Sequence, residues 1–202
     1  MIIVPPLLRV NSFRWTLLRN DIENRSVFGS QSIQAASPVW AVSMGGVPQK
    51  RYDAMACEQF LEALEGKRNQ CEMFHRAHKV PAGTLRSVLT LSAAVGVGAL
   101  SLPCVASAVA GQTLLKGDLL GLGIVLTQQV VRVAEDAVTD SSGNINISIN
   151  TPLRNGFSAG LAVIWNQPKA LFRQRETNPG IEYVPGAIGM GWTLDLIEDW
   201  RP

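Results

Sequence analysis

Charge is scarce in this sequence of 202 residues. Asp, Glu, Lys and Arg make up 17% of it, against about 25% in an average globular domain. The formal net charge is only +2 and no run of Lys and Arg stands out, which is too little to argue for a nucleic-acid-binding protein. Because surface charge keeps monomers soluble, so low a content favours a protein that buries surface against partners. Hydrophobic residues make up 47%, which is enough for a buried core.

Cysteine is scarce as well. The chain has only Cys57, Cys71 and Cys104, an odd number without a CxxC pair. This pattern predicts no zinc site, and its simplest interpretation is buried, reduced thiols in a protein made in a cytoplasm. Residues 1–9 lack the basic start and long apolar centre of a signal peptide, so we expect no secretion signal.

The stretch from Val88 to Ala110 has no charged residue, and its length alone would suffice for a membrane helix. Gly96, Gly98 and Pro103 interrupt it, and no basic cluster or aromatic belt flanks it. We therefore expect two or three short strands here, with turns at residues 96–98 and 102–103, and no insertion into a membrane.

Groups that could carry chemistry are scattered. His75 and His78 form an HxxH pair, but residues three apart on a strand face opposite sides, so we expect surface or interface histidines. The carboxylates of Asp118 and of residues 135–136 fall at predicted turns, where Asp bonds the local backbone. Residues 121–123 (Gly-Leu-Gly) lack the third glycine and the helix of a phosphate loop. We expect no catalytic, cofactor or metal site, and a non-enzymatic protein.

Tryptophan is spread along the whole chain. We expect these side chains to anchor the core or an interface, with sugar stacking by Trp40 or Trp165 as the alternative. The five positions are Trp15, Trp40, Trp165, Trp192 and Trp200.

One amphipathic α-helix is predicted at about residues 52–65. Asp53 near its start suits the positive end of the helix dipole, and Gly66 is a typical stop. Glu58, Glu62 and Glu65 decorate its polar side. The predicted apolar stripe consists of Met55, Ala56, Phe60, Leu61 and Leu64.

Most of the remaining chain predicts strands. Ile145, Ile147 and Ile149 alternate with polar residues and should face a core, after a turn at residues 140–143 (Asp-Ser-Ser-Gly). Residues 116–118 (Lys-Gly-Asp) indicate a hairpin between 113–115 and 119–120. Other expected strands are 13–18, 26–28, 32–34, 38–44, 71–76, 161–165, 170–174 and 188–197.

These patterns predict a mainly β fold, a β-sandwich or barrel with one helix at about 52–65. A single domain over residues 1–202 is expected, with a division into 1–85 and 86–202 as the alternative.

Several segments follow one another in a distinctive order. They are 37–40 (SPVW), 60–66 (FLEALEG), 73–74 (MF), 81–85 (PAGTL), 114–120 (LLKGDLL), 130–133 (VVRV), 143–147 (GNINI) and 151–154 (TPLR). This order resembles that of minor tail proteins of long-tailed bacteriophages, of the distal-tail or baseplate-hub kind. The resemblance covers roughly residues 10–200 and lies in order and spacing rather than in one motif.

The resemblance implies a structural virion protein, made in the bacterial cytoplasm and located in the phage tail. Such proteins form homo-oligomeric rings, here expected to be hexameric, which link the tail tube to tip, hub or fibre proteins. DNA would be only cargo passing through the channel. Residues 1–12 and the polar loop 175–187 are our candidates for outside contacts. A tail-tube or tail-completion protein, a carbohydrate-binding β-sandwich using Trp40 or Trp165, and a small hydrolase are the alternatives, the hydrolase being the least favoured.

Overall fold

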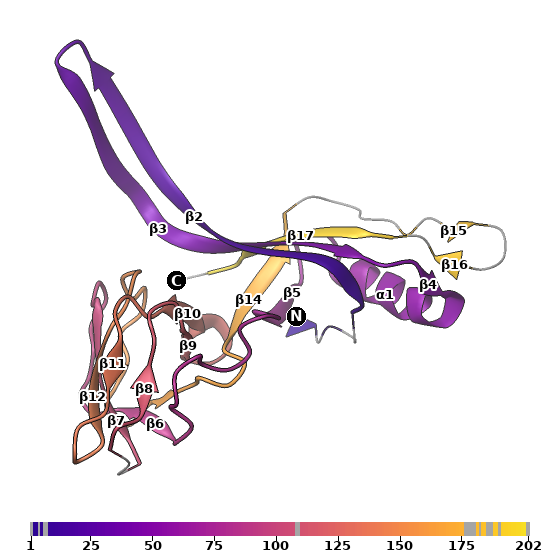
Figure 1. Cartoon of the computed structure of the whole chain (residues 1–202). Coiled ribbons are helices and arrows are strands. Elements are labelled where there is room, and N and C mark those ends of the chain that lie inside the picture. Colours follow the sequence, from indigo (N-terminus) through magenta and orange to yellow (C-terminus); the bar gives the residue numbers. More distant parts are fainter. Residues whose placement is uncertain are drawn as a thin grey trace. The chain divides into compact units, whose positions relative to one another are not determined.

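The computed structural model of this chain is mainly β, with one α-helix in the part that it describes (Figure 1). That part comprises residues 2–3, 5, 8–107, 110–175, 181, 183–184, 188–189 and 191–200. The mainly β fold predicted from the sequence is therefore confirmed.

The chain divides into two compact units, which we describe separately. The first consists of Met1–Met73 and Leu171–Asp199, and the second of Phe74–Ala170 and Trp200–Pro202. The chain thus leaves the first unit after residue 73 and returns to it at residue 171. The sequence predicts a single domain, with a division at residue 85 as the alternative, and carries no signal for this return.

A six-stranded sheet dominates the first unit, in the order β1-β5-β14-β17-β3-β2. Its strands are β1 (Ile2–Ile3), β2 (Val10–Ser26), β3 (Gly29–Gly46), β5 (Gln70–Phe74), β14 (Lys169–Gln174) and β17 (Thr193–Glu198). β1 pairs with β5 in parallel, whereas β14, β17, β3 and β2 pair antiparallel in that order. A smaller sheet of the same unit joins β15 (Tyr183–Val184), β16 (Ile188–Gly189) and β4 (Gln49–Lys50).

β2 and β3 form one long hairpin instead of the several short strands that the sequence predicts. Their pairing runs from Val10 opposite Gly46 to Ser26 opposite Gly29, with register shifts near Leu18 and Asn20. Val27 and Phe28, the end of a predicted strand over 26–28, form the turn. The base of the hairpin alternates, with Trp40, Val42 and Met44 buried, and the predicted strands 13–18 and 38–44 lie there. The continuous hairpin was not predicted because the described side chains of its outer part are exposed and give no hydrophobic alternation to link the pieces.

Aromatic residues and one buried carboxylate fix the base of this hairpin. The Trp15 ring centroid lies 5.8 Å from that of Trp40 and 5.1 Å from that of Phe172, the latter pair edge to face. Trp40 also donates its backbone N–H to the carboxylate of Glu198 at 2.9 Å. Since Phe172 and Glu198 belong to β14 and β17, these contacts tie the hairpin to the C-terminal strands.

The predicted helix is confirmed as α1 (Arg51–Ala63), but its buried side differs from the predicted stripe. Met55 and Ala56 are exposed, whereas Ala54 and Cys57 are buried. Both sets have helical spacing, so periodicity alone could not choose between them. The helix packs near β4, where the Cys57 thiol donates a hydrogen bond to the Gln49 amide oxygen at 3.8 Å. Gly66 follows with φ +65°, the conformation expected of a helix stop.

The second unit contains a four-stranded antiparallel sheet, β12-β7-β6-β13, and the pairs β9–β10 and β8–β11. Its strands are β6 (Leu89–Leu91), β7 (Ser101–Ala106), β8 (Thr113–Leu114), β9 (Leu119–Leu122), β10 (Gln129–Arg132), β11 (Ala137–Val138), β12 (Asn144–Ser148) and β13 (Ala162–Val163). Ile145, Ile147 and Ile149 are buried in its aliphatic core, as predicted.

Of two turns predicted in the second unit, one is confirmed and one is wrong. Asp140 accepts hydrogen bonds from the backbone N–H groups of Ser142 and Asn144, and Gly143 has φ +81°, which confirms that turn. The predicted turn at Leu102 and Pro103 is wrong, because both lie within β7. The Pro103 carbonyl accepts the Ser92 N–H at 2.9 Å, just after the end of β6. Because proline has no backbone N–H, Pro103 cannot donate the reciprocal hydrogen bond to Ser92, and the pairing of β6 with β7 ends there.

The hairpin predicted around residues 116–118 is also wrong. A turn is present, with Gly117 at φ +100°, but the strands on its two sides pair with β11 and β10 and not with each other.

Strands instead of a membrane helix occupy the described part of residues 88–110, and none of the described helices is long and apolar enough to cross a membrane. The predicted strands over 161–165 and 188–197 are shorter than expected, as β13 and as β16 with β17.

Candidate functional site

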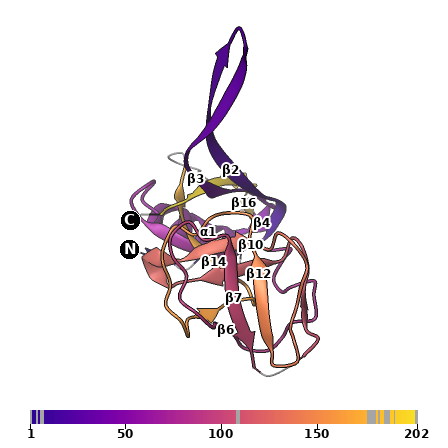
Figure 2. The same cartoon turned by 90° about the vertical axis from the view of Figure 1, so that its left-hand side faces the viewer.

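Among the described residues, the outer parts of β2 and β3 pair only with each other, because the pairing of β17 with β3 ends at Ala41. We call residues 20–36 of this ribbon the arm (Figures 1 and 2). At its tip Val27 is 98% and Phe28 100% exposed, and Ile22 and Ile33 are exposed along its length. A two-stranded ribbon is marginally stable at best in water. The arm therefore has the properties of a segment that is stabilised on a partner.

The arm has two chemically different faces. No register shift interrupts the strands from Asp21 to the tip, so Asp21, Glu23 and Arg25 share one face. The Arg25 guanidinium donates to the Glu23 carboxylate at 3.0 Å, which agrees with that placement. Ile22 lies opposite Ile33 on the other face. One face of the arm is thus charged and the other carries an apolar pair.

The six-stranded sheet has an open face at the base of the arm. Arg14 and Asp195 both lie opposite Ser43, from the two strands that flank β3, and all three residues are exposed. The neighbouring register positions, such as Trp15 and Val42, point to the opposite, packed face. Polar side chains of three strands therefore form a row across this face.

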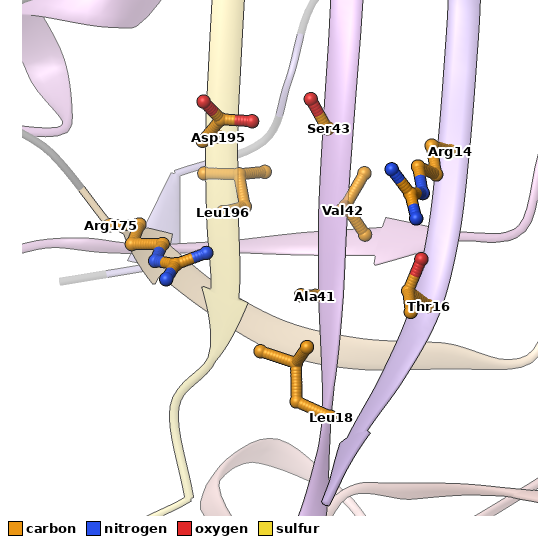
Figure 3. Close-up of a pocket in the computed structure, with 9 residues that line it drawn as sticks. All are labelled: Arg14, Thr16, Leu18, Ala41, Val42, Ser43, Arg175, Asp195 and Leu196. Carbon is orange, nitrogen blue, oxygen red and sulfur yellow. The ribbon is translucent and has the colours of Figure 1, made fainter.

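A hollow of about 300 Å³ lies over this row (Figure 3). The guanidinium groups of Arg14 and Arg175 point toward it from opposite sides. Asp195, Ser43 and Leu18 also line it. Within the described part of the chain, neither Arg14 nor Arg175 forms an ion pair, whereas Arg9, Arg25, Arg68 and Arg173 do. We call the set Arg14, Arg175 and Asp195 the sheet-face charges.

The second unit presents a tight aliphatic loop. Thr127 closes it, because its hydroxyl donates to the Ile124 carbonyl at 2.8 Å and accepts from the Ile124 N–H at 3.2 Å. The enclosed residues Ile124, Val125 and Leu126 are all exposed. Val125 has φ +51°, a strained conformation for a β-branched residue. Strain of this kind persists where the surroundings impose it, and here the closed turn does so.

His75 and His78 come together in the second unit. Their ring centroids lie 4.5 Å apart, and the His78 backbone N–H donates to His75 Nδ1 at 3.0 Å. Burial, with help from the charges of His78 and Arg132, lowers the pKa of His75 to about 4. Among the described residues, no group of three or more His, Cys, Asp and Glu side chains could hold a metal ion. This arrangement keeps His75 neutral near pH 7.

The carboxylates weighed for acid–base chemistry lie in turns. Asp118 is only 4% exposed and accepts backbone N–H groups of Ala82 at 2.7 Å and Leu115 at 2.8 Å. Asp136 accepts the Lys116 N–H at 2.7 Å. Both side chains therefore hold backbone in place, as expected for Asp at turns.

Gly121 and Gly123 do not form a phosphate-binding loop. Gly121 belongs to β9, and a Cβ there would lie 3.2 Å from that of Pro168. Gly123 has φ +78° and packs closely against Thr127, so no side chain is tolerated there. A short 3-10 turn (Val125–Thr127) follows instead of an α-helix. Both glycines are explained by close packing.

Residues 156–160 (Gly-Phe-Ser-Ala-Gly) match the Gly-x-Ser-x-Gly pattern of serine hydrolases, which the sequence analysis missed. In hydrolases this serine lies on a sharp turn between a strand and a helix. Here Phe157 forms an isolated bridge with Val95, a turn follows at residues 159–160, and no helix begins there. The motif lacks its structural context, so we do not assign Ser158 a nucleophilic role.

The tryptophans considered for sugar stacking are largely occupied. Trp40 is 2% exposed, so its face is not available to a ligand. Trp165 donates its indole N–H to the Ser87 carbonyl at 2.9 Å, and the Arg86 guanidinium lies 5.8 Å from its ring centre. Trp192 is buried as well. These positions agree better with core anchoring than with a sugar platform.

A scan against models of protein families and a search of the curated proteins found no match to this chain. The two segments that the sequence singled out for contacts, 1–12 and 175–187, lie partly or mostly outside the described residues. Arg175 belongs to the second of these segments and is among its described residues, whereas the arm, Arg14 and Asp195 lie outside both.

Proposed function

We propose that this chain is a structural virion protein of a long-tailed bacteriophage, of the distal-tail or baseplate kind. Its subunits form a homo-oligomeric ring that links the tail tube to tip, hub or fibre proteins. The function is mechanical and architectural, and involves no catalysis.

The arm is the observation that carries this proposal. It places exposed apolar residues, Val27 and Phe28 at its tip and Ile22 and Ile33 along it, on a ribbon that pairs with no further strand in the described part of the chain. Assembly onto a neighbouring molecule would cover that surface and supply the missing support. A surface of this kind is unfavourable in a monomer and useful in a subunit.

Three further features support the proposal. The order of sequence segments resembles that of distal-tail and baseplate-hub proteins, as described above. The charge content is low, which favours burial of surface against partners. The candidate catalytic groups have structural partners instead, as in the hydrogen bonds of Asp118 and Asp136.

The experiment is electron microscopy and sedimentation of the purified full chain over a wide range of concentration. We expect closed rings with a central channel at high concentration. A chain that stays monomeric throughout, and that also fails to bind a purified tail-tube protein, would contradict the proposal.

A paired variant makes the test specific to the arm. Val27→Ser with Phe28→Ser removes the apolar tip without touching the core, and we expect it to abolish rings while the monomer stays folded. Val97→Ser is the matched control, because Val97 is an exposed valine of the second unit. Rings that form equally well from the tip variant would show that the apolar tip is not needed for joining.

A further inference from the structure

We infer that the charged face of the arm docks on the sheet-face charges of a second copy of this chain. This inference rests on the proposed self-assembly and names the acceptor surface for the arm. The acceptor is the hollow formed by Arg14, Arg175 and Asp195 on the open face of the sheet (Figure 3).

The two surfaces carry opposite charges. The acceptor presents two guanidinium groups and one carboxylate, and the arm presents two carboxylates and one guanidinium, those of Asp21, Glu23 and Arg25. Each charge of one set can thus face an opposite charge of the other. Complementarity of this kind selects a partner and fixes register more than it adds raw affinity.

The two carboxylates of the arm lie close together on one face. Asp21 and Glu23 are two residues apart on a strand, so their Cα atoms lie about 7 Å apart on one face. Arg14 and Arg175 line the hollow from opposite sides, and their guanidinium groups point toward it. Leu18 and Ala41 line the same hollow and offer apolar contact beside the charges.

Docking would cost few existing interactions. The Glu23–Arg25 ion pair of the arm is exposed, and such pairs contribute little to stability. Arg14 and Arg175 have no ion pair to give up in the described part of the chain. The charged groups of both surfaces can therefore form new ion pairs at little cost in existing ones.

The arm and the acceptor are different surfaces of the same chain. A contact between them is heterologous, and heterologous contacts generate closed rings when the rotation between subunits closes. The inferred contact thus has the symmetry that the proposed ring requires.

Two reciprocal charge reversals test the inference. The acceptor variant carries Arg14→Glu and Arg175→Glu, and the arm variant carries Asp21→Lys and Glu23→Lys. Each should weaken self-association about tenfold or more in sedimentation experiments at low salt. The control variant Lys67→Glu with Arg68→Glu reverses two exposed cations after α1 and should leave association unchanged. Circular dichroism and thermal unfolding check that each variant is folded.

Mixing the two variants gives the decisive readout. An equimolar mixture allows two kinds of contact. The acceptor variant has an unaltered arm, which can bind the unaltered acceptor of the arm variant. The reversed arm of the arm variant is positive and the reversed acceptor of the acceptor variant is negative, so these two surfaces can also bind each other. We expect rings to reappear in the mixture, with alternating subunits, although each variant alone stays dispersed.

The remaining outcomes overturn the inference. Unchanged association of either variant, or a mixture that stays dispersed, would show that these two surfaces do not meet. If the unaltered chain forms rings in those cases, the proposed function stands and only the acceptor is wrong. If the unaltered chain does not self-associate at all, both proposals fail.

Discussion

The carboxylate of Asp118 accepts a 2.7 Å hydrogen bond from the backbone N–H of Ala82, which lies 36 residues earlier in the chain. The same carboxylate accepts the N–H of Leu115 at 2.8 Å and that of Gly83 at 3.4 Å. One buried side chain thus holds the 81–83 loop against the turn at 115–118. In a sequence with few charges, this carboxylate has a structural use.

Asp118→Asn tests that use. The amide nitrogen would bring its own N–H groups against backbone N–H donors, which leaves buried donors unsatisfied. We expect the free energy of unfolding to fall by about 2 kcal/mol in urea titrations. Asp140→Asn is the matched control: Asp140 also accepts backbone N–H groups, but it is exposed, so water can replace the lost bonds. Equal losses for the two variants would argue against the role of burial.

Local patterns predicted the features that depend on near neighbours. The helix, the buried face of Ile145, Ile147 and Ile149, and the Asp140 turn all follow from spacing within a few residues. Local spacing does not determine that Cys57 is buried and Met55 exposed, because this depends on what packs against the helix. Periodicity specifies a stripe only where one set of apolar residues fits it.

The candidate site could not be predicted, for two reasons. The arm is exposed on both faces, so it has no hydrophobic period to reveal its strands. The sheet-face charges come together only through strand register, since Arg14 and Asp195 meet on either side of Ser43 although they are distant in sequence. Pairing of distant strands is a property of the fold and leaves no local motif.

The strained turn at Val125 gives a second prediction. Val125 has φ +51° and is 51% exposed, so glycine should relieve the strain while little packing is lost. We expect Val125→Gly to raise the free energy of unfolding by about 1 kcal/mol. Val97→Gly is the control, because Val97 is exposed without a positive φ, and it should lower stability. A loss of stability in both variants would show that the turn is not strained.

His75 predicts how stability depends on pH. Its pKa is about 4 in the folded protein and 6.5 in the reference state, so the unfolded chain takes up the proton first as the pH falls. The contribution of His75 is therefore fully present above about pH 6.5 and is lost as the pH falls towards about 4. His75→Asn keeps an acceptor for the His78 N–H but does not titrate. We expect its stability to depend less on pH in this window, and identical pH profiles would contradict the prediction.

The three thiols should be inert in the folded protein. Burial raises the pKa of Cys71 and of Cys104 to about 12, and it also raises that of Cys57. Since the thiolate is the reactive form, Ellman's reagent should not label the native chain at neutral pH. All three cysteines should react once the chain is unfolded in guanidinium. Rapid labelling of the native chain would mean that at least one thiol is accessible.

Limited proteolysis can report on the arm directly. Arg19 and Arg25 are exposed trypsin sites on or beside the arm, and Arg68 is an exposed site elsewhere in the first unit. In dilute solution we expect early cleavage at Arg19 or Arg25, because an unsupported two-stranded ribbon opens readily. At concentrations where the chain assembles, cleavage in the arm should slow while cleavage at Arg68 continues at its former rate. Mass spectrometry of the fragments distinguishes the sites. Arm cleavage that is equally fast in assembled material would mean that the arm stays uncovered, and the joining contact would have to lie elsewhere.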